Sequence, residues 1–135
     1  MSFVKFSGED ATWVRFADSR IYIGDVVDES KSSSMGVGLA HFGAGEEMPW
    51  TPSYDEAIVV LSGEFTVERG SERITAARGE IAWVRPGPEV IFRAGDEPVT
   101  LAFASHPVWK HSEAAAAASS VLHPVGLAEV EGVIR

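Results

Sequence analysis

Short apolar runs alternate with turn-forming residues from Ala11 to Ala104, and this pattern predicts an all-β protein. Gly, Pro, Ser and Asp interrupt the runs at intervals of roughly ten residues, a spacing typical of a β-sandwich or a β-barrel. Turns are expected at Ser62-Gly63, Gly70-Ser71, Arg78-Gly79 and Pro86 to Pro88. We therefore predict about eight to ten short strands.

The run MGVGLAHF (35–42) shows the alternation that assigns strand faces. Side chains of a strand alternate with period two, so Val37, Leu39 and His41 are predicted to share one face. The serine-rich segment before it (30–36) lacks apolar anchors and is predicted to be a loop. His41 is thus expected in line with apolar neighbours.

The segment 112–122 departs from the strand pattern. Its five consecutive alanines favour a helix, and Ser112 with the glutamate after it is typical of a cap and first turn. We expect this helix to end before His123-Pro124 and to lie outside the barrel or reach a second subunit. The chain of 135 residues is predicted to be a single domain, with a barrel core at about 11–109 and this helical tail.

Composition narrows the classes of partner. Eleven basic against twenty acidic side chains give a formal net charge of -9, so the mean field repels nucleic acid and anionic lipid. The chain has no cysteine, which leaves neither a disulfide framework nor a thiol nucleophile. No segment approaches the roughly 18 uninterrupted apolar residues of a membrane span. We expect a cytoplasmic protein that binds neither nucleic acid nor membrane.

The sequence also resembles a known family. The spacing of its first motif is given by Gly43, Pro49, Thr51, Glu56 and Gly63. This spacing, followed by GEIAWVRPG (79–87), resembles the two motifs of the cupin superfamily. The resemblance implies a cupin fold, the double-stranded β-helix or jelly-roll barrel. Metal-binding cupins carry histidines where this chain has Pro49, Thr51 and Val90, so no metal cofactor is predicted.

A narrower resemblance comes from the run WTPSYDE (50–56). Together with the flanking SMGVGLAHF and VLSGEFTV, it is similar to EutQ-type ethanolamine-utilisation cupin domains, which also lack the histidines. The similarity spans roughly 35–109. It implies a link to ethanolamine or acetate metabolism and, if the chain is an enzyme, an acetate kinase-like activity.

Glu56 is the principal candidate for chemistry. By period two its side chain shares a face with Ile58 and Val60, which is the barrel interior if the cupin alignment holds. A carboxylate there is either ionised and paired with a cation, or protonated and hydrogen-bonded. The structural alternative is a glutamate held by Tyr54, Trp50 or backbone donors to close the barrel.

His41 and Tyr54 complete the candidate catalytic set. If the face of His41 is internal, its imidazole approaches Glu56 across neighbouring strands and suits proton transfer; the structural alternative is a satisfied core histidine. Candidate ligand-binding residues are Trp50, Asp55, Arg85 and His106. The Arg85 guanidinium suits a carboxylate or phosphate, and Asp55 with Glu56 is the obvious magnesium pair for phosphoryl transfer.

Three functional hypotheses follow. The first is a metal-free barrel that binds a small polar metabolite. The second is a metal-dependent cupin isomerase or dioxygenase that uses His41, Glu56 and His106 as ligands of a divalent metal. The third is a non-catalytic scaffold module. We expect a homodimer, because cupin barrels commonly pair through their sheets.

Overall fold

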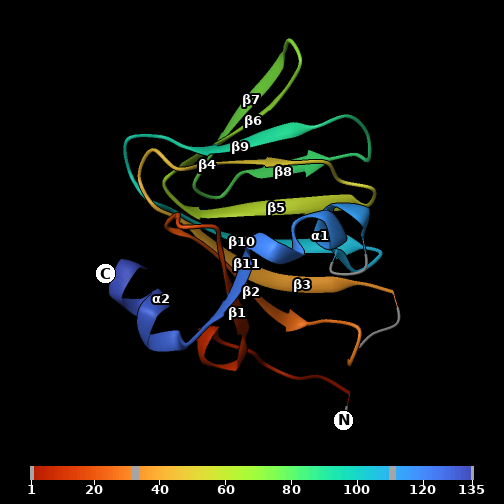
Figure 1. Cartoon of the computed structure of the whole chain (residues 1–135), viewed down its shortest axis with the longest axis vertical. Helices are drawn as coiled ribbons and strands as arrows, with labels where there is room; N and C mark the ends of the chain where they lie inside the picture. Colours follow the sequence, from red (N-terminus) through yellow and green to blue (C-terminus); the bar gives the residue numbers. More distant parts are fainter. Residues whose placement is uncertain (1, 32–33, 110–111, 135) are drawn as a thin grey trace.

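The fold is an antiparallel β-structure in two sheets. The computed structural model describes residues 2–31, 34–109 and 112–134, which form eleven strands (Figure 1). The larger sheet has the order β11 (Leu122–Val125), β1 (Thr12–Phe16), β2 (Ile21–Val27), β3 (Gly36–Phe42), β10 (Val99–His106), β5 (Asp55–Ser62) and β8 (Ile81–Val84). The smaller sheet has the order β4 (Glu47–Trp50), β9 (Val90–Ala94), β6 (Glu64–Arg69) and β7 (Glu72–Ala77).

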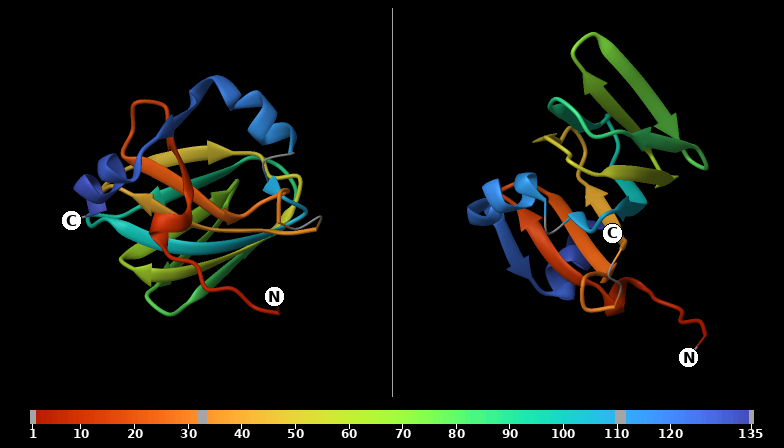
Figure 2. Two further views of the ribbon diagram at one scale, coloured as in Figure 1. Left: turned by 90° about the horizontal axis from the view of Figure 1, so that it is seen from below. Right: turned by 90° about the vertical axis from the view of Figure 1, so that its right-hand side faces the viewer.

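The two sheets face each other around one apolar core, and the β6–β7 hairpin extends beyond it (Figure 2). Alternate residues of β10 and β9 point inward, as the period of two requires. Three aromatic rings join the sheets: Phe42 meets Phe65 edge to face at 5.3 Å, and Phe65 stacks on Phe92 at 5.5 Å between centroids. The predicted all-β barrel is confirmed.

The predicted turns are observed where the chain reverses between strands. Gly63, Gly70 and Gly79 have positive φ angles of 79°, 59° and 84°. At Gly63 an added Cβ would lie 2.4 Å from the carbonyl oxygen of Pro98, so only glycine fits there. The predicted loop at 30–36 lies partly outside the described residues; Ser34 and Met35 precede β3 without belonging to a strand.

The C-terminal segment is more than the predicted helical tail. The helix is observed as α1 (Glu113–Ala117) and the 3-10 turn η3 (Ser119–Val121), and the Ser112 hydroxyl caps it by accepting from the Ala115 amide at 3.1 Å. Beyond it, β11 pairs with β1 and leads into α2 (Leu127–Ile134). Pro124 is tolerated in β11 because this strand is at the sheet edge. No helix among the described residues is long and apolar enough to cross a membrane.

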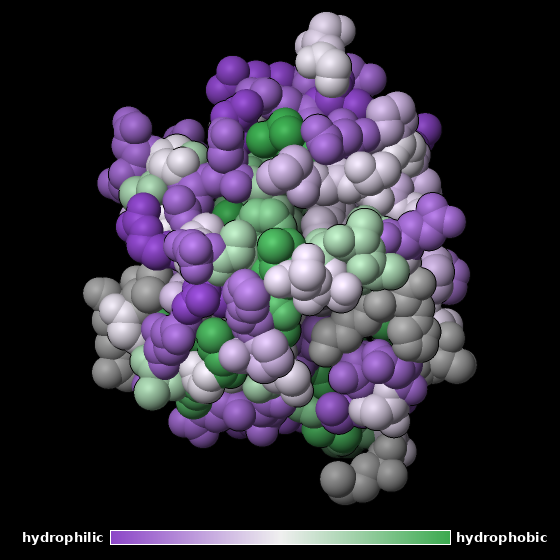
Figure 3. Space-filling view, viewed as in Figure 1, coloured by the Kyte–Doolittle hydropathy of each residue, from purple (hydrophilic) through white to green (hydrophobic). Residues whose placement is uncertain are grey.

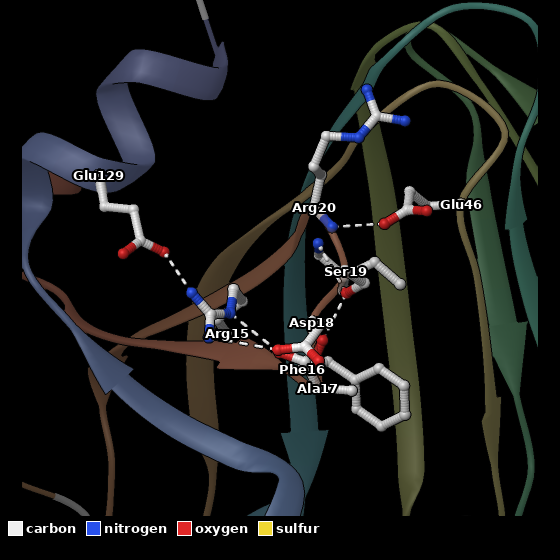
Figure 4. A network of polar contacts seen from close by, with 9 residues as sticks. Arg15, Phe16, Ala17, Asp18, Ser19, Arg20, Glu46 and Glu129 are labelled. Carbon is white, nitrogen blue, oxygen red and sulfur yellow. Dashed lines mark hydrogen bonds and ion pairs between the residues drawn. The ribbon is translucent and has the colours of Figure 1, made fainter.

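A polar network fastens the turn between β1 and β2 to the elements around it (Figure 4). Arg15 donates to the Glu129 carboxylate of α2 at 3.2 Å and to the Ala17 carbonyl at 2.9 Å. The backbone amide of Arg20 donates to the Glu46 carboxylate. The network holds α2 against the outer face of the larger sheet, where Val130 is fully buried beside Trp13.

Candidate functional site

A cavity of about 50 Å³ lies between the two sheets. An engineered apolar cavity of about 150 Å³ holds one benzene, so this cavity, about a third of that volume, has room for only a few non-hydrogen atoms. Its walls are mostly apolar side chains, among them Phe42, Ile58, Phe92, Leu101 and Phe103. The lining residues that carry polar groups are Trp50, Tyr54, Glu56 and Trp109. The cavity therefore suits a very small ligand with one polar end.

Glu56 lies on the inward face of β5, as the strand period and the cupin resemblance together predicted. It pairs with Ser105 of β10 and Val84 of β8 and lines the cavity beside Ile58. Burial raises the pKa of the Glu56 carboxyl from its ordinary 4.5 to about 8. At neutral pH the group is therefore mostly protonated, and it can give up its proton close to physiological pH. No lysine, arginine or histidine lines the cavity among the described residues.

Tyr54 and Trp50 form a buried pair at the same end of the cavity. The indole Nε1–H of Trp50 donates to the Tyr54 hydroxyl oxygen at 2.6 Å. The hydroxyl proton of Tyr54 remains available to a ligand or to Glu56. Burial and then the nearby Glu56 charge raise the pKa of Tyr54, so the phenol stays protonated and serves as a donor.

Asp25 and Trp109 extend this polar cluster behind the cavity. The Trp109 Nε1–H donates to the buried Asp25 carboxylate at 2.7 Å, and the Trp109 ring meets Trp50 edge to face at 5.8 Å. Neither residue was a sequence candidate. A usable signal was present in Asp25, an acid inside the otherwise apolar strand IYIGDVV, because buried charges usually need a partner.

His41 lies on the opposite face of the larger sheet from Glu56. Its neighbours Ala40 and Phe42 line the cavity, so the imidazole points outward and is covered until only 1% of the residue is exposed. Its Nδ1 is 3.4 Å from the Thr100 hydroxyl. Burial and then the charge of Arg20 lower the pKa of His41, which keeps the ring neutral. The predicted approach of His41 to Glu56 is not formed.

The physical reason is the size of the residues on each face of β3. An added Cβ on Gly38 would lie 2.6 Å from the Phe103 ring, which fills the interior there. Gly38 therefore faces inward beside Phe103, and Ala40 and Phe42 follow on the same face of β3. The larger Leu39 packs outward against Trp13, and His41 shares that side. The sequence predicts the approach to Glu56 only if the face of His41 is internal, and in the structure this face is external and bordered by Trp13 of β1 and Val130 of α2.

The remaining candidates lie outside the cavity. Arg85 is exposed, with its guanidinium stacked 4.9 Å from the Trp83 ring centroid. The His106 Nδ1 donates to the Ser34 carbonyl at 2.7 Å. Asp55 and His106 are cross-strand partners and border a surface pocket with Glu56. Of the Asp55, Glu56 and Arg85 set predicted for phosphoryl transfer, only Glu56 thus lines the cavity.

The alternative metal site is not assembled either. His41 faces outward on β3, and His106 is exposed at the end of β10. Within the described ranges, no three His, Asp or Glu side chains are grouped so that they could hold a metal ion.

A surface groove beside α1 adjoins the cavity. It is lined by Phe16, Pro49, Thr51 and Ala117, and by Trp50, which also lines the cavity. The Trp50 ring therefore lies between the groove and the cavity. Figure 3 shows hydrophobic residues gathered along the middle of this face, where the two sheets meet beside α1 and β11. Pro49 and Thr51, at the histidine positions of the first cupin motif, line the groove rather than the cavity.

Comparisons with known proteins agree with the fold and motifs. The family described as ethanolamine utilisation protein EutQ matches residues 13–111. The acetate kinase EutQ of Salmonella typhimurium is 34% identical over 68 residues, which are 50% of this chain and 29% of that protein. The chain thus spans less than a third of this relative.

Solved structures show the same barrel. A crystal structure of ethanolamine utilization protein Q from Salmonella typhimurium LT2 superposes with a TM-score of 0.60 at 28% identity, covering 65% of this chain and 70% of that one. The cupin domain of Schizosaccharomyces pombe Cnp3 superposes with a TM-score of 0.63 at 17% identity, covering 77% and 74%. The chain therefore belongs to the EutQ family of ethanolamine-utilisation proteins and has the cupin fold.

Proposed function

We propose that this EutQ-family barrel binds a small metabolite of ethanolamine utilisation in its interior cavity, without a metal ion. One observation carries the proposal: an otherwise apolar cavity holds a single carboxyl group, that of Glu56, beside the Tyr54 hydroxyl. A few placed polar groups in apolar walls are typical of small-molecule sites. Trp50 closes the site towards the α1 groove, and Glu56 and Tyr54 would act on the ligand.

The size of the cavity sets the expected affinity. The best very small ligands gain about 1.5 kcal/mol per non-hydrogen atom, so three atoms give a Kd of roughly 0.5 mM. Binding should therefore be measured by a method that detects weak complexes. Two-dimensional NMR serves because the indole N–H groups of Trp50 and Trp109 are both at the cavity.

The test is a titration of labelled protein with polar metabolites of two to four non-hydrogen atoms. We expect at least one to shift the two indole signals. Ala40→Val fills part of the cavity and should abolish the shifts. Ala102→Val makes the same change on the outer face of the adjacent strand and should leave them intact. Equal binding by both variants, or no indole shift with any compound, would contradict the proposal.

Acetate kinase activity is the second candidate, favoured by the name of the Salmonella relative, acetate kinase EutQ, and by the surface pocket where Asp55, Glu56 and His106 meet. The cavity is too small for a nucleotide, so phosphoryl transfer would have to use this surface pocket. The expected result is acetyl phosphate formation that requires Asp55 and Glu56. Activity unchanged in Asp55→Ala and in Glu56→Ala would exclude this use of the pocket.

We also propose that the outer face of β5 and β8 pairs with a second copy of the chain. Ile81 and Trp83, on the edge strand β8, are 65% and 62% exposed. Val59 and Ala57 lie opposite them on β5, so the patch is apolar over two strands. A two-fold axis makes such a patch complementary to itself.

Light scattering of the eluted protein tests the dimer. Trp83→Glu should give a monomer at micromolar concentration, because it places a charge in the centre of the patch. Ile74→Glu, which changes an exposed residue of β7 in the other sheet, should leave the dimer intact. A monomeric unmodified protein would contradict this part of the proposal.

A further inference from the structure

We propose that the ligand of the cavity is a small organic cation, a primary ammonium of about two to four non-hydrogen atoms, whose charge pairs with the Glu56 carboxylate. The inference rests on the proposed function, because it names the class of ligand that the same site takes. It is drawn from the charges, donors and rings around the cavity.

The charges around the cavity have one sign. Glu56 and Tyr54 are the ionisable groups of its described walls, and the charge of Asp25 is near enough to raise the pKa of Tyr54. The candidate cation, Arg85, is exposed and stacked on Trp83, which lies on the outer face of β8. A buried anion needs a paired cation or several donors. Among the described lining residues an anion would have no cation to pair with, whereas an ammonium would meet a carboxylate.

The donors at this end of the cavity are already used within the protein. The Trp50 indole N–H is donated to Tyr54 and the Trp109 indole N–H to Asp25. This leaves the Tyr54 hydroxyl as the donor facing a ligand, together with Glu56 when it is protonated. A carboxylate or phosphate ligand requires more donors than these. An ammonium instead requires acceptors, which the Glu56 carboxylate and the Tyr54 oxygen provide.

The aromatic walls add to the preference for a cation. Trp50 and Trp109 meet edge to face at 5.8 Å, and Phe42, Phe92 and Phe103 line the same cavity. Ring faces attract cations electrostatically, and the attraction is stronger in a site without water. The volume of about 50 Å³ limits the cation to a few atoms and excludes bulky quaternary ammonium groups. Ethanolamine, with four non-hydrogen atoms, falls within this class.

Proton release gives the inference a distinctive signature. The Glu56 carboxyl of the free protein has a pKa of about 8, so below pH 8 an ammonium must displace its proton. Affinity should rise with pH up to about 8 and fall again when the amine itself loses its proton, near pH 10 for an alkylamine. A neutral ligand would show neither the rise nor the proton release.

The experiment compares ethylammonium, ethanol and acetate, which have similar size and different charge. Each is titrated at pH 8 and followed by the Trp50 and Trp109 indole signals, and proton release is measured by calorimetry at pH 7 in two buffers. We expect ethylammonium to bind at least tenfold more tightly than the other two and to release protons. Glu56→Gln should weaken it at least tenfold, and Glu64→Gln, an exposed residue of β6, should not.

The outcomes separate this inference from the proposed function. Acetate or ethanol binding as tightly as ethylammonium would overturn the cation assignment and leave an interior site in place. Ethylammonium binding without proton release, or binding unchanged in Glu56→Gln, would overturn the role of the carboxylate. The calorimetric result uses the unmodified protein, so it stands even if a variant fails to fold. Binding of other metabolites, but not of ethylammonium, would also overturn the inference and retain the site.

Discussion

Two titratable groups on opposite faces of one sheet, the half-buried Glu56 and the buried His41, have opposite consequences for this protein. Glu56 faces inward on β5 and adjoins the interior cavity, whereas His41 faces outward on β3 and lines a pocket bordered by Trp13 of β1 and Val130 of α2. Burial raises the pKa of the acid and lowers the pKa of the base, so both are mostly uncharged at neutral pH. Only Glu56 has space beside it for a ligand of the barrel interior. His41 instead borders a pocket on the outer face of the sheet, so the two groups differ in which pocket each one lines.

The largest expected effect is on the pH dependence of stability through Glu56. Its folded pKa of about 8 lies above the ordinary 4.5, so the folded protein keeps a proton that the unfolded chain releases between these values. The stabilisation is complete below pH 4.5 and is lost as pH rises to 8, by at most about 1.4 kcal/mol per pH unit. Urea unfolding at pH 5 to 9 should show wild type losing stability relative to Glu56→Gln and then levelling off.

The matched control for this prediction is Glu64→Gln, which removes an exposed carboxylate from β6. Its unfolding free energy should follow that of wild type across the pH range. If the unfolding free energies of wild type and Glu56→Gln change in parallel with pH, the pKa of Glu56 is not raised. The opposite pKa shifts of Glu56 and His41 would then be contradicted.

A smaller effect is expected from Tyr54→Phe. The substitution removes the acceptor of the Trp50 indole N–H, and leaving a buried donor unpaired costs about 1–3 kcal/mol. Burial, rather than the Tyr54 hydroxyl, raises the pKa of Glu56. The loss of unfolding free energy in Tyr54→Phe should therefore be similar at every pH. Urea unfolding of this variant at pH 5 and pH 8 distinguishes the stability lost with the Trp50–Tyr54 hydrogen bond from stability that depends on the ionisation of Glu56. A loss confined to high pH would show that the tyrosine sets the ionisation of Glu56.

The smallest effect should come from His41, and its sign should be the reverse. The folded pKa lies below the ordinary 6.5, so the stability associated with the neutral ring is present above 6.5 and is lost as pH falls through the folded pKa. A His41→Gln variant should lack this loss. Proton NMR of the imidazole, titrated from pH 7 downward, measures the pKa of His41 directly. A pKa at or above the ordinary 6.5 would contradict the opposite effects of burial on the two groups.

Local patterns in the sequence determined the strands, the turns and the family of this protein. The spacing of apolar runs and turn glycines predicted the strands, because side-chain alternation and positive φ angles are properties of a few consecutive residues. The same period placed Glu56 on one face with Ile58 and Val60, and the cupin resemblance assigned that face to the interior. The motifs around 50–56 and 79–87 led to the cupin and EutQ families, and both are confirmed.

Only the tertiary structure decided which face of each strand is inside and which distant residues meet. His41 faces outward because Phe103 fills the interior beside Gly38, a packing relation between two strands. Asp25 meets Trp109 across 84 positions of the chain, and β11 joins the first strand from the far end of the sequence. Periodicity sorts side chains into two faces but does not say what will cover each face. That choice depends on packing between elements, which a local pattern does not contain.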